Sequence, residues 1–402
     1  MEFIEGGVCA PKGYVAAGIN CGIRNKKKRD LALIVSQRMA SAAGVYTQNL
    51  VKGAPVTVTQ QNLENGYARA IICNSGNANT CNPNGISIAE GMCELVEMYT
   101  GVKQQDVIVA STGVIGQELN LEPIALGMPA LVTSLGRNSE DAAEAIMTTD
   151  TVKKELAAKF TVGGRPVKIG AIAKGSGMIC PNMATMLVFI TTDAKITPAM
   201  LQKALNECVR DSFNMISIDR DTSTNDMVVV LANGLAENED IATDSQNYQD
   251  FKAALMEICV RLARSIAKDG EGATKLLECR VTGAKTDEAA RTVAKSVICS
   301  TLLKCAMFGA DANWGRVLCS IGYSGANVDV SKIAVGFTSD AGEIRVCENG
   351  AGITFSEESA KSVLSKDEIT INVDLNDGDH AAAAFGCDLT YDYVKINGDY
   401  RT

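Results

Sequence analysis

The stretch KGSGMICPNMATMLVFITTDA, residues 174–194, changes character partway along and decides the fold expected for this chain. Its glycine-rich beginning, KGSG, leads into the turn-forming sequence PNMA at residues 181–184. Thr185 follows, and residues 186–190 form an apolar run that predicts a buried strand. The sequence therefore places a threonine hydroxyl on a turn at the beginning of a buried strand.

A hydroxyl held on a strained turn can attack the carbonyl carbon of the residue before it, here Ala184. The peptide bond becomes an ester, and its hydrolysis would leave two fragments, 1–184 and 185–402. The freed amine of Thr185 has a reference pKa near 8, so it can serve as general base for its own hydroxyl. A single threonine that opens a strand is more often structural, and the residues alone leave both interpretations open.

The chain has one histidine, His380, and this limits the chemistry available to it. A Ser-His-Asp triad, a Cys-His pair and a histidine-rich metal site all need imidazole. His380 lies in LNDGDHAAAAFG, a polar turn before a run of small residues, which predicts a surface loop histidine. We therefore expect no metal site, and any acyl chemistry needs another base, such as the amine of a freed Thr185.

Composition excludes several classes of protein. The 402 residues suggest two or three domains' worth of core, and 46% are hydrophobic and 21% charged, as in an ordinary globular protein. A net charge of −9 argues against a nucleic-acid partner. The sequence predicts neither a signal peptide nor a membrane span. Fourteen scattered cysteines without a C-x-x-C pair predict reduced thiols of a cytoplasmic protein.

Helical and strand-like patterns alternate along the chain, which predicts an α/β (α+β) fold in which helices pack on sheets as layers. The expected helices are residues 87–99, a helix that begins at Thr197-Pro198, and residues 251–268. The expected strands are residues 67–74, 106–112, 332–339, 343–350, 368–375 and 389–398.

The segment KGSGMICPNMATML resembles the cleavage segment of the ornithine acetyltransferase family, the glutamate N-acetyltransferases of the acetyl-cycling arginine pathway. Eight further blocks match this family in order along nearly the whole chain: AAGVYTQN from Ala42, NSGNAN from Asn74, STGVIG from Ser111, IMTTD from Ile146, DRDTSTND from Asp219, KDGEGATK from Lys268, FGADANWGR from Phe308 and GCDLTYDYVKING from Gly386. The resemblance implies a self-cleaving acetyltransferase with an N-terminal threonine nucleophile.

The same resemblance implies the fragments and substrates of the enzyme. An alpha chain, 1–184, would carry the oxyanion-hole donors, and a beta chain, 185–402, would begin with the nucleophile Thr185. The two would associate as a cytoplasmic α2β2 heterotetramer. Acetyl would pass from N-acetyl-L-ornithine to L-glutamate through acetyl-Thr185, without a cofactor. Members of the family differ in whether acetyl-CoA is also a donor, and no motif separates them.

The resemblance also implies roles for individual residues. Thr112 and Gly113 match the pair that forms the oxyanion hole. The positions that match substrate contacts are Thr148, Thr149, Lys174, Thr185, Glu271, Asn397 and Thr402, with the choice between the two neighbouring threonines left open. As bare sequence features, Lys174 is typical of a solvated loop lysine and Glu271 of an exposed acid beyond a helix end.

Two other classes of function remain to be separated from this one. A hydrolase with the same self-processed nucleophile, such as the related aminopeptidases, would pass the acyl group to water instead of an amine. A ligand-binding protein without enzymatic activity would stay uncut and form no acyl adduct. The sequence departs from the family's usual pattern at Arg220, His380, Gly398 and Arg401, all outside the cleavage segment.

Overall fold

The structure is a computed structural model that describes residues 1–24, 28–180 and 186–398. The chain forms two compact units. The first comprises Met1–Gly175, Asn182–Arg210 and Thr222–Leu262, and the second comprises Ser176–Pro181, Asp211–Asp221 and Ala263–Thr402. Neither unit coincides with one of the two predicted fragments, because both units draw on residues from either side of position 184.

The first unit is built around a nine-stranded sheet in the order β1-β6-β7-β8-β10-β3-β4-β5, with β2 also paired to β3. Its strands are β1 (Glu2–Ile4), β2 (Tyr14–Ile19), β3 (Leu31–Tyr46), β4 (Tyr67–Asn74), β5 (Val107–Ser111), β6 (Lys154–Val162), β7 (Arg165–Lys174), β8 (Leu187–Thr192) and β10 (Met227–Ala232). The long strand β3 connects two layers, since its first half pairs with β2 and β4 and its second half with β10.

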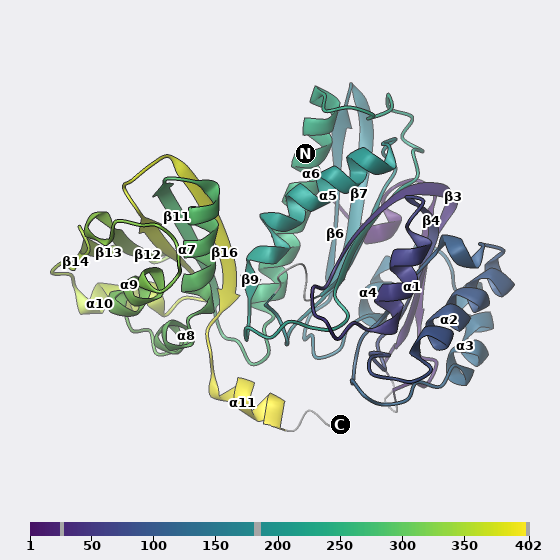
Figure 1. Cartoon of the computed structure of the whole chain (residues 1–402), viewed down its shortest axis with the longest axis horizontal. Helices are drawn as coiled ribbons and strands as arrows, with labels where there is room; N and C mark the ends of the chain where they lie inside the picture. Colours follow the sequence, from purple (N-terminus) through teal and green to yellow (C-terminus); the bar gives the residue numbers. More distant parts are fainter. Residues whose placement is uncertain (25–27, 181–185, 399–402) are drawn as a thin grey trace. The chain divides into compact units, whose positions relative to one another are not determined.

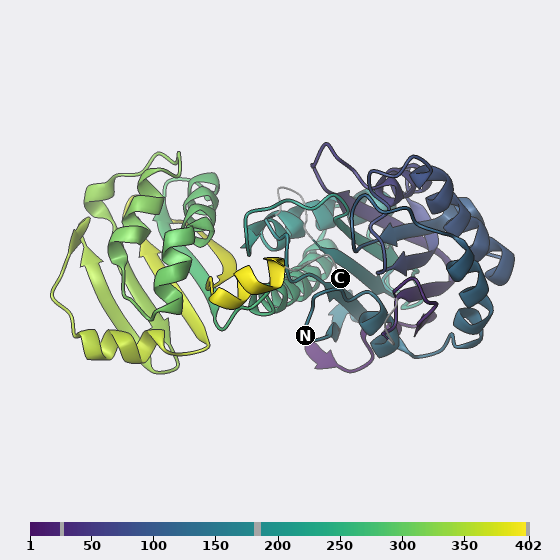
Figure 2. The ribbon, with the colours of Figure 1, turned by 90° about the horizontal axis from the view of Figure 1, so that it is seen from below.

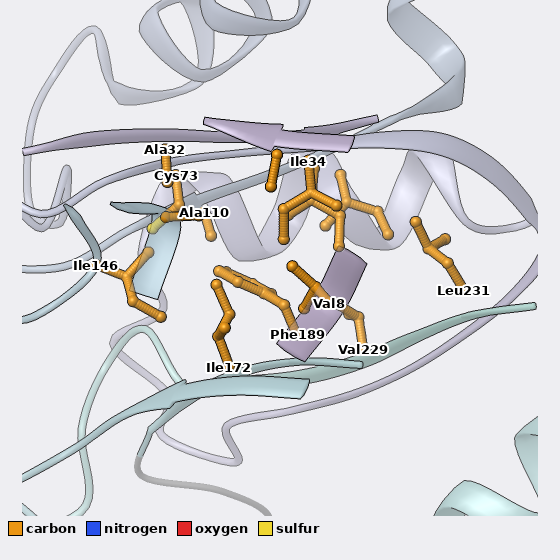
Figure 3. Packing of buried hydrophobic residues seen from close by; sticks show 14 of the residues in the cluster. Val8, Ala32, Ile34, Cys73, Ala110, Ile146, Ile172, Phe189, Val229 and Leu231 are labelled. Atoms are coloured by element: carbon orange, nitrogen blue, oxygen red, sulfur yellow. The ribbon is translucent and has the colours of Figure 1, made fainter. Parts of the chain in front are cut away.

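The core of the first unit lies between these two layers of strands (Figure 3). Strand β8 shows why: Leu187 and Phe189 belong to this core, whereas Val188 and Ile190 are buried on the opposite face. A strand covered on both faces reads as the continuous apolar run seen in the sequence. The prediction of a buried strand here is confirmed.

Helices cover the outer faces of both layers (Figure 1). They are α1 (Ala54–Asn62), α2 (Gly85–Thr100), α3 (Glu122–Thr133), α5 (Pro198–Arg210) and α6 (Gln246–Lys268), whereas α4 (Ser139–Ala145) lies between the layers. Helices α1 and α2 pack on β5, α3 packs on β2, and α5 packs on β3. On α6, the ring of Phe251 lies 6.4 Å from that of Phe160 in β6. The layered fold expected from the sequence is confirmed, although α4 packs within the core.

The second unit contains a seven-stranded sheet in the order β14-β13-β12-β15-β11-β16-β9. The strands are β9 (Ile216–Ser217), β11 (Leu276–Ala284), β12 (Ala334–Ser339), β13 (Gly342–Glu348), β14 (Ala351–Gly352), β15 (Glu368–Asp374) and β16 (His380–Cys387). The helices are α7 (Asp287–Cys299), α8 (Thr301–Phe308), α9 (Trp314–Gly322), α10 (Glu357–Leu364) and α11 (Tyr391–Gly398), the last drawn in yellow after β16 (Figures 1 and 2).

Side chains along the strands of the second sheet alternate between its two faces. In β15 the apolar residues Ile369, Ile371 and Val373 are buried, and the polar residues between them are more exposed. Helix α7 packs on β11 and β16, and α10 on β12 and β13. One face of this sheet is therefore apolar and covered by helices, and the other is polar.

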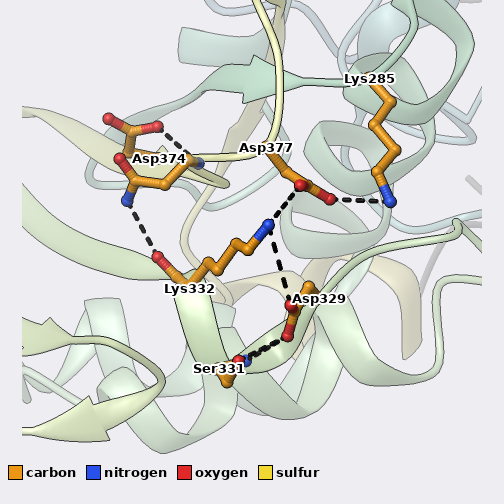
Figure 4. A network of polar contacts seen from close by, with 7 residues as sticks. Lys285, Asp329, Ser331, Lys332, Asp374 and Asp377 are labelled. Carbon is orange, nitrogen blue, oxygen red and sulfur yellow. Dashed lines mark hydrogen bonds and ion pairs between the residues drawn. The ribbon is translucent and has the colours of Figure 1, made fainter.

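A network of ion pairs links the loops at one end of this second sheet (Figure 4). Asp377 contacts Lys332 at 2.6 Å and Lys285 at 2.8 Å, and Lys332 also lies 3.9 Å from Asp329. The lysine side chains are nearly half exposed, so solvent screens these pairs and they contribute little to the stability of the fold. The network organises the surface at this end of the sheet.

Most of the expected elements are present, with two errors near the end of the chain. Residues 389–398 were expected to be a strand, but helix α11 occupies Tyr391–Gly398. The hydroxyl of Thr390 lies 3.3 Å from the amide nitrogen of Tyr393, the bond of a helix cap, and this local contact prevails over β propensity. His380 opens strand β16 instead of lying in a loop, and its Nδ1 is 2.8 Å from Asp287.

Candidate active site

The predicted nucleophile precedes a central strand of the first sheet. Thr185 and Ala184 lie outside the described residues, but β8 begins at Leu187, two residues further on. Leu187 pairs with Lys174 of β7 on one side and with Met227 of β10 on the other. The backbone register therefore brings Lys174 to the beginning of β8.

Two other predicted segments approach the same end of the core. Strand β10 runs parallel to β8, and Leu231 lies near the last residue of β10. Leu231 is at one end of the core, and Ile146, Cys73 and Ala110 are at the other end (Figure 3). The beginning of β8 is thus on the side of the core where Ile146 and Ala110 lie. Both residues stand two positions before the predicted site pairs, Thr148 after Ile146 and Thr112 after Ala110.

A buried carboxylate, Asp150, organises this region. Its Oδ1 accepts hydrogen bonds from Lys154 Nζ at 2.7 Å and from the amide of Gly175 at 2.8 Å. Its Oδ2 accepts one from the amide of Thr148 at 3.0 Å. Burial raises the pKa of Asp150, but the ammonium groups of Lys174 and Lys154 and the Gly175 amide outweigh it and hold the pKa at about 2. Asp150 therefore stays ionised.

Lys174 is buried, contrary to the solvated loop lysine that its sequence context alone suggests. Burial lowers the pKa of its ammonium, and the carboxylate of Asp150 opposes that shift. The other charged groups that act on Lys174 are Lys154, Asp226 and Arg24. Three cations thus face two anions, and the surplus positive charge suits an anionic group such as the α-carboxylate of an amino acid.

The predicted oxyanion donors follow strand β5. Asn74 accepts from the amides of Gly76 and Asn77 through its side chain, each at 3.1 Å, and its Nδ2 donates to Ser111 Oγ at 2.6 Å. The amide of Thr112 donates to the carbonyl of Asn74 at 3.0 Å. Because that amide is already used, the Thr112 hydroxyl and the Gly113 amide are the donors left for an oxyanion.

Gly113 occupies a backbone conformation that needs glycine. Its φ is +129°, and a Cβ at this position would lie 2.9 Å from the amide nitrogen of Asn77 and from the carbonyl carbon of Gly76. The loop after β4 therefore packs directly on the loop after β5. This close approach fixes the direction of the Gly113 amide.

A second cluster of predicted residues lies in the second unit. Glu271 is buried, not exposed beyond a helix end, and its Oε2 accepts a hydrogen bond from Asn397 Nδ2 at 2.8 Å. Its amide donates to the carbonyl of Ser176 at 2.9 Å. A Cβ on Gly177 would come within 2.3 Å of the Glu271 carboxyl carbon, so this glycine makes room for the carboxylate.

Asp219 adds a second carboxylate to this cluster. It accepts from the amides of Met178 at 2.6 Å and Ile179 at 2.8 Å, and burial raises its pKa. Burial, Asp219 and Glu271 together raise the pKa of the Tyr393 hydroxyl. The negative charge gathered here suits a cationic amine.

The structure thus groups the predicted residues into two sets, one in each unit. Thr112, Gly113, Thr148 and Lys174 belong to the first unit, and Glu271 and Asn397 to the second. Thr148 is tied to Asp150 through its amide, whereas Thr149 follows as a half-buried residue of the same bend. Thr402 lies outside the described residues.

Sequence reasoning missed the two carboxylates that hold these segments. Asp150 and Asp219 stand inside the matched blocks IMTTD and DRDTSTND, so their presence there was the available signal. Across residues 1–24, 28–180 and 186–398, no group of three or more His, Cys, Asp or Glu side chains is placed to hold a metal ion. Within those same ranges, every helix is too short or too polar to cross a membrane.

Comparison with known proteins identifies the family. A sequence model of the ArgJ family matches residues 15–402. The arginine biosynthesis bifunctional protein ArgJ of Caldanaerobacter subterraneus is 49% identical over 404 residues, which cover 100% of both chains. This chain belongs to the ArgJ family. The ArgJ protein of Bacillus subtilis is 47% identical over 401 residues, which cover 99% of this chain and 97% of that protein.

A solved ArgJ structure agrees with this assignment. The crystal structure of the arginine biosynthesis bifunctional protein ArgJ from Bacillus halodurans is 48% identical, with a TM-score of 0.51. The match covers 53% of this chain and 99% of that chain. The matched ArgJ polypeptide is therefore about half as long as the present chain.

Proposed function

We propose that this protein is a self-processing acetyltransferase that moves acetyl from N-acetyl-L-ornithine to L-glutamate through an acetyl-Thr185 intermediate. Membership of the ArgJ family supports the activity. The observation that carries the site assignment is the register of β8, whose first residue, Leu187, pairs with Lys174. A nucleophile two residues before Leu187 would stand at the same end of the core as Thr112 and Thr148.

In the first half-reaction the Thr185 hydroxyl attacks the acetyl carbonyl carbon of the donor, and the amine of Thr185 takes up the hydroxyl proton. The Gly113 amide and the Thr112 hydroxyl donate hydrogen bonds to the negative oxygen of the tetrahedral intermediate. The amine of Thr185 then returns its proton to the leaving α-nitrogen of ornithine. Acetyl-Thr185 remains, and ornithine departs.

In the second half-reaction the α-amine of glutamate attacks the same acetyl carbon, and the ester bond to the Thr185 oxygen breaks. The amine of Thr185 takes the proton that the attacking nitrogen loses and passes it to the released Thr185 hydroxyl, and N-acetyl-L-glutamate departs. Donor and acceptor both carry an α-carboxylate, which Lys174 would bind, so one pocket would serve both in turn. Glu271 and Asn397 would bind the side-chain amine of ornithine. This assignment rests on the buried carboxylate of Glu271 and on its neighbour Asp219.

We further propose that the fragments 1–184 and 185–402 stay together after cleavage and assemble as a cytoplasmic α2β2 heterotetramer. Strands β7 and β8 belong to different fragments and pair over six residues, from Ile169↔Thr192 to Lys174↔Leu187. The half-length ArgJ chain in the solved relative supports cleavage. Fourteen free cysteines are in keeping with a reducing compartment.

The relatives are named bifunctional proteins, which supports a second activity for this protein. We propose acetyl-CoA as a second donor for the same acetyl-Thr185 intermediate. An assay with acetyl-CoA and glutamate, without acetylornithine, tests this directly. Formation of N-acetylglutamate would support the proposal, and its absence from this mixture, with N-acetylglutamate formed only when acetylornithine is present, would contradict it.

The central experiment separates processing from transfer. On a denaturing gel the purified protein should give fragments 1–184 and 185–402, and the second should begin Thr-Met-Leu-Val. Thr185→Ala should stay uncut because alanine lacks the attacking oxygen, whereas Thr185→Ser, which keeps a hydroxyl, should still be cut. An uncut chain with full activity would contradict the mechanism.

Transfer is then distinguished from hydrolysis with the processed protein. Incubation with acetylornithine alone should add one acetyl group to the fragment 185–402, and addition of glutamate should remove it as N-acetylglutamate. The alternative, an amidohydrolase or aminopeptidase of the same architecture, would release free acetate at the same rate with or without glutamate.

A further inference from the structure

Two cysteines of the second unit lie in contact where the segment before the cleavage site ends. The Sγ atoms of Cys180 and Cys299 are 4.0 Å apart, and both residues are partly accessible to solvent. The backbone around Cys180 is anchored, since the amide of Ile218 donates to the carbonyl of Ile179 at 2.6 Å and Asp219 holds the two preceding amides. Cys299 is the last residue of α7.

The surroundings of this pair favour a thiolate on Cys299. Lys295 lies one helical turn before it, and its Nζ donates to the carbonyl oxygens of Asn214, at 2.7 Å, and Ile216. A hydrogen bond from the Cys180 thiol and the charge of Lys295 outweigh burial and lower the pKa of Cys299. The negative end of the α7 helix dipole opposes this shift, but the Cys180 hydrogen bond and the Lys295 charge outweigh it.

A buried hydroxyl completes the environment of the two sulfur atoms. The contact between the two thiols is the main cause of the raised pKa of Cys180 and of the lowered pKa of Cys299. Ser217 Oγ, which is buried without a hydrogen-bond partner among the described residues, lowers the pKa of both to a lesser extent. Buried hydroxyl groups normally find a partner. A thiolate on Cys299 would provide the acceptor that this hydroxyl otherwise lacks.

We propose that Cys180 and Cys299 form a thiol pair that a hydroperoxide oxidises to an intramolecular disulfide. The Cys299 thiolate attacks the outer oxygen of the hydroperoxide, the O–O bond breaks, and the leaving alkoxide or hydroxide takes up a proton. Cys299 becomes a sulfenic acid. The Cys180 sulfur then attacks the Cys299 sulfur, the S–O bond breaks, and water leaves with the Cys180 proton.

Overall, two thiols lose two electrons and two protons, and one hydroperoxide is reduced to an alcohol or to water with release of one further water molecule. The sulfur atoms must approach from 4.0 Å to the bonding distance of about 2.05 Å. The disulfide would hold the end of the segment 176–180 against α7. If the chain is cleaved after Ala184, which rests on the proposed function, the bond would also join the two fragments covalently.

The test uses the full-length purified protein, reduced and then exposed to hydrogen peroxide. Digestion and mass spectrometry after blocking of free thiols should yield a peptide pair joined through Cys180 and Cys299. Denaturing gels without reductant should show one species of full length, which separates into the two fragments on addition of reductant. A chain that proves uncut would show only the linked peptide, so the failure of cleavage and the failure of oxidation are distinguishable.

Variants assign the roles of the two sulfur atoms. Cys180→Ser and Cys299→Ser should each abolish the linked peptide, whereas the control Cys305→Ser, which removes an exposed cysteine of the same unit, should keep it. In Cys180→Ser, a sulfenic-acid probe such as dimedone should label Cys299. Lys295→Gln should slow this labelling several-fold because the thiolate loses its cation.

Two results would overturn the proposal. One is that peroxide treatment leaves both thiols free to react with an alkylating reagent. The other is that Cys180→Ser oxidises to the same linked products as the parent protein.

Discussion

Replacement of Asp150 by asparagine should destabilise the first unit severely, because it removes the buried carboxylate that pairs with Lys154. The side chains of Lys154 and Asp150 are 1% and 0% exposed, and Lys174 is buried in the same region. An asparagine could still accept from Lys154 and Gly175 through its oxygen. Its NH2 group would then face the amide of Thr148, a donor opposite a donor.

The magnitude follows from these contacts. Removal of one partner of a buried ion pair costs about 3–5 kcal/mol, because the remaining charge stays buried without compensation. For a unit of this size, each 1 kcal/mol lowers the unfolding temperature by about 2–4 °C, so a decrease of about 10 °C is expected. Asp141→Asn is the control. Asp141 contacts Arg29 at 3.0 Å with both side chains more than a third exposed, and its loss should cost about 1 kcal/mol or less.

Scanning calorimetry of both variants at pH 7 measures the effect, with the first unfolding transition as the readout. Variants made in the Thr185→Ala background are free of differences in processing. Acetyl transfer by the processed Asp150→Asn protein should also decrease, since Thr148 and Lys174 lose their common partner. A decrease in unfolding temperature no greater than that of Asp141→Asn would refute the reasoning, because it would mean that water or another group already compensates the two ammonium groups.

Three further predictions concern the same two clusters. Gly113→Ala should lower the rate of both half-reactions by about 10²–10³ and destabilise the fold, because the added Cβ would lie 2.9 Å from backbone atoms. Gly116→Ala, where φ is +75° and no atom lies within 4 Å of the added Cβ, is the control for backbone strain alone. Equal losses of rate and stability in the two variants would contradict a role for the close contacts of Gly113. Glu271→Gln should raise the KM for acetylornithine more than the KM for glutamate. Glu343→Gln, which changes an exposed residue, is the control and should change neither KM. Equal changes in both KM values would mean that Glu271 only shapes the pocket. Acid titration should remove about 2 kcal/mol of unfolding free energy from the first unit as the pH falls from about 4 to 2. The pKa of Asp150 in the folded protein, about 2, lies below the ordinary value of 3.8, so its carboxylate stabilises the fold above pH 4 and stops doing so when it is protonated. The unfolding free energy of Asp150→Asn should therefore not decrease in this way over the same pH range.

The sequence predicted the helices and strands that have clear local patterns well, and it predicted the last segments of the chain poorly. The apolar run after Thr185 and the Thr197-Pro198 helix start depend on local patterns, and both are confirmed by β8 and α5. The helix at Tyr391–Gly398 was predicted as a strand because its Tyr and Val residues favour β structure. Strand β16 was missed because its run of alanines gives a weak β signal and its pairing with β11 is a distant contact.

The residues of the site could be predicted from the sequence, but the partners that hold their side chains in place could not. The family resemblance indicated Lys174 and Glu271, whereas the bare residues suggested solvated side chains. Both are buried, since each lies beside partners that are distant in sequence, Asp150 for Lys174 and Asn397 for Glu271. Burial of a charged group depends on such distant partners, and no local pattern in one sequence reports them.

The place of β8 in the sheet has a consequence for the order of events during synthesis. β8 and β10 would belong to the later of the two proposed fragments, and they lie between β7 and β3, which would belong to the earlier one. If the chain were cut on leaving the ribosome, each piece would expose long unpaired strand edges, which promote aggregation. Two halves encoded by separate genes would meet the same hazard. Scission at Ala184-Thr185 would therefore have to wait for the sheet to close, so that the appearance of the mature terminus reports completed folding of the first unit.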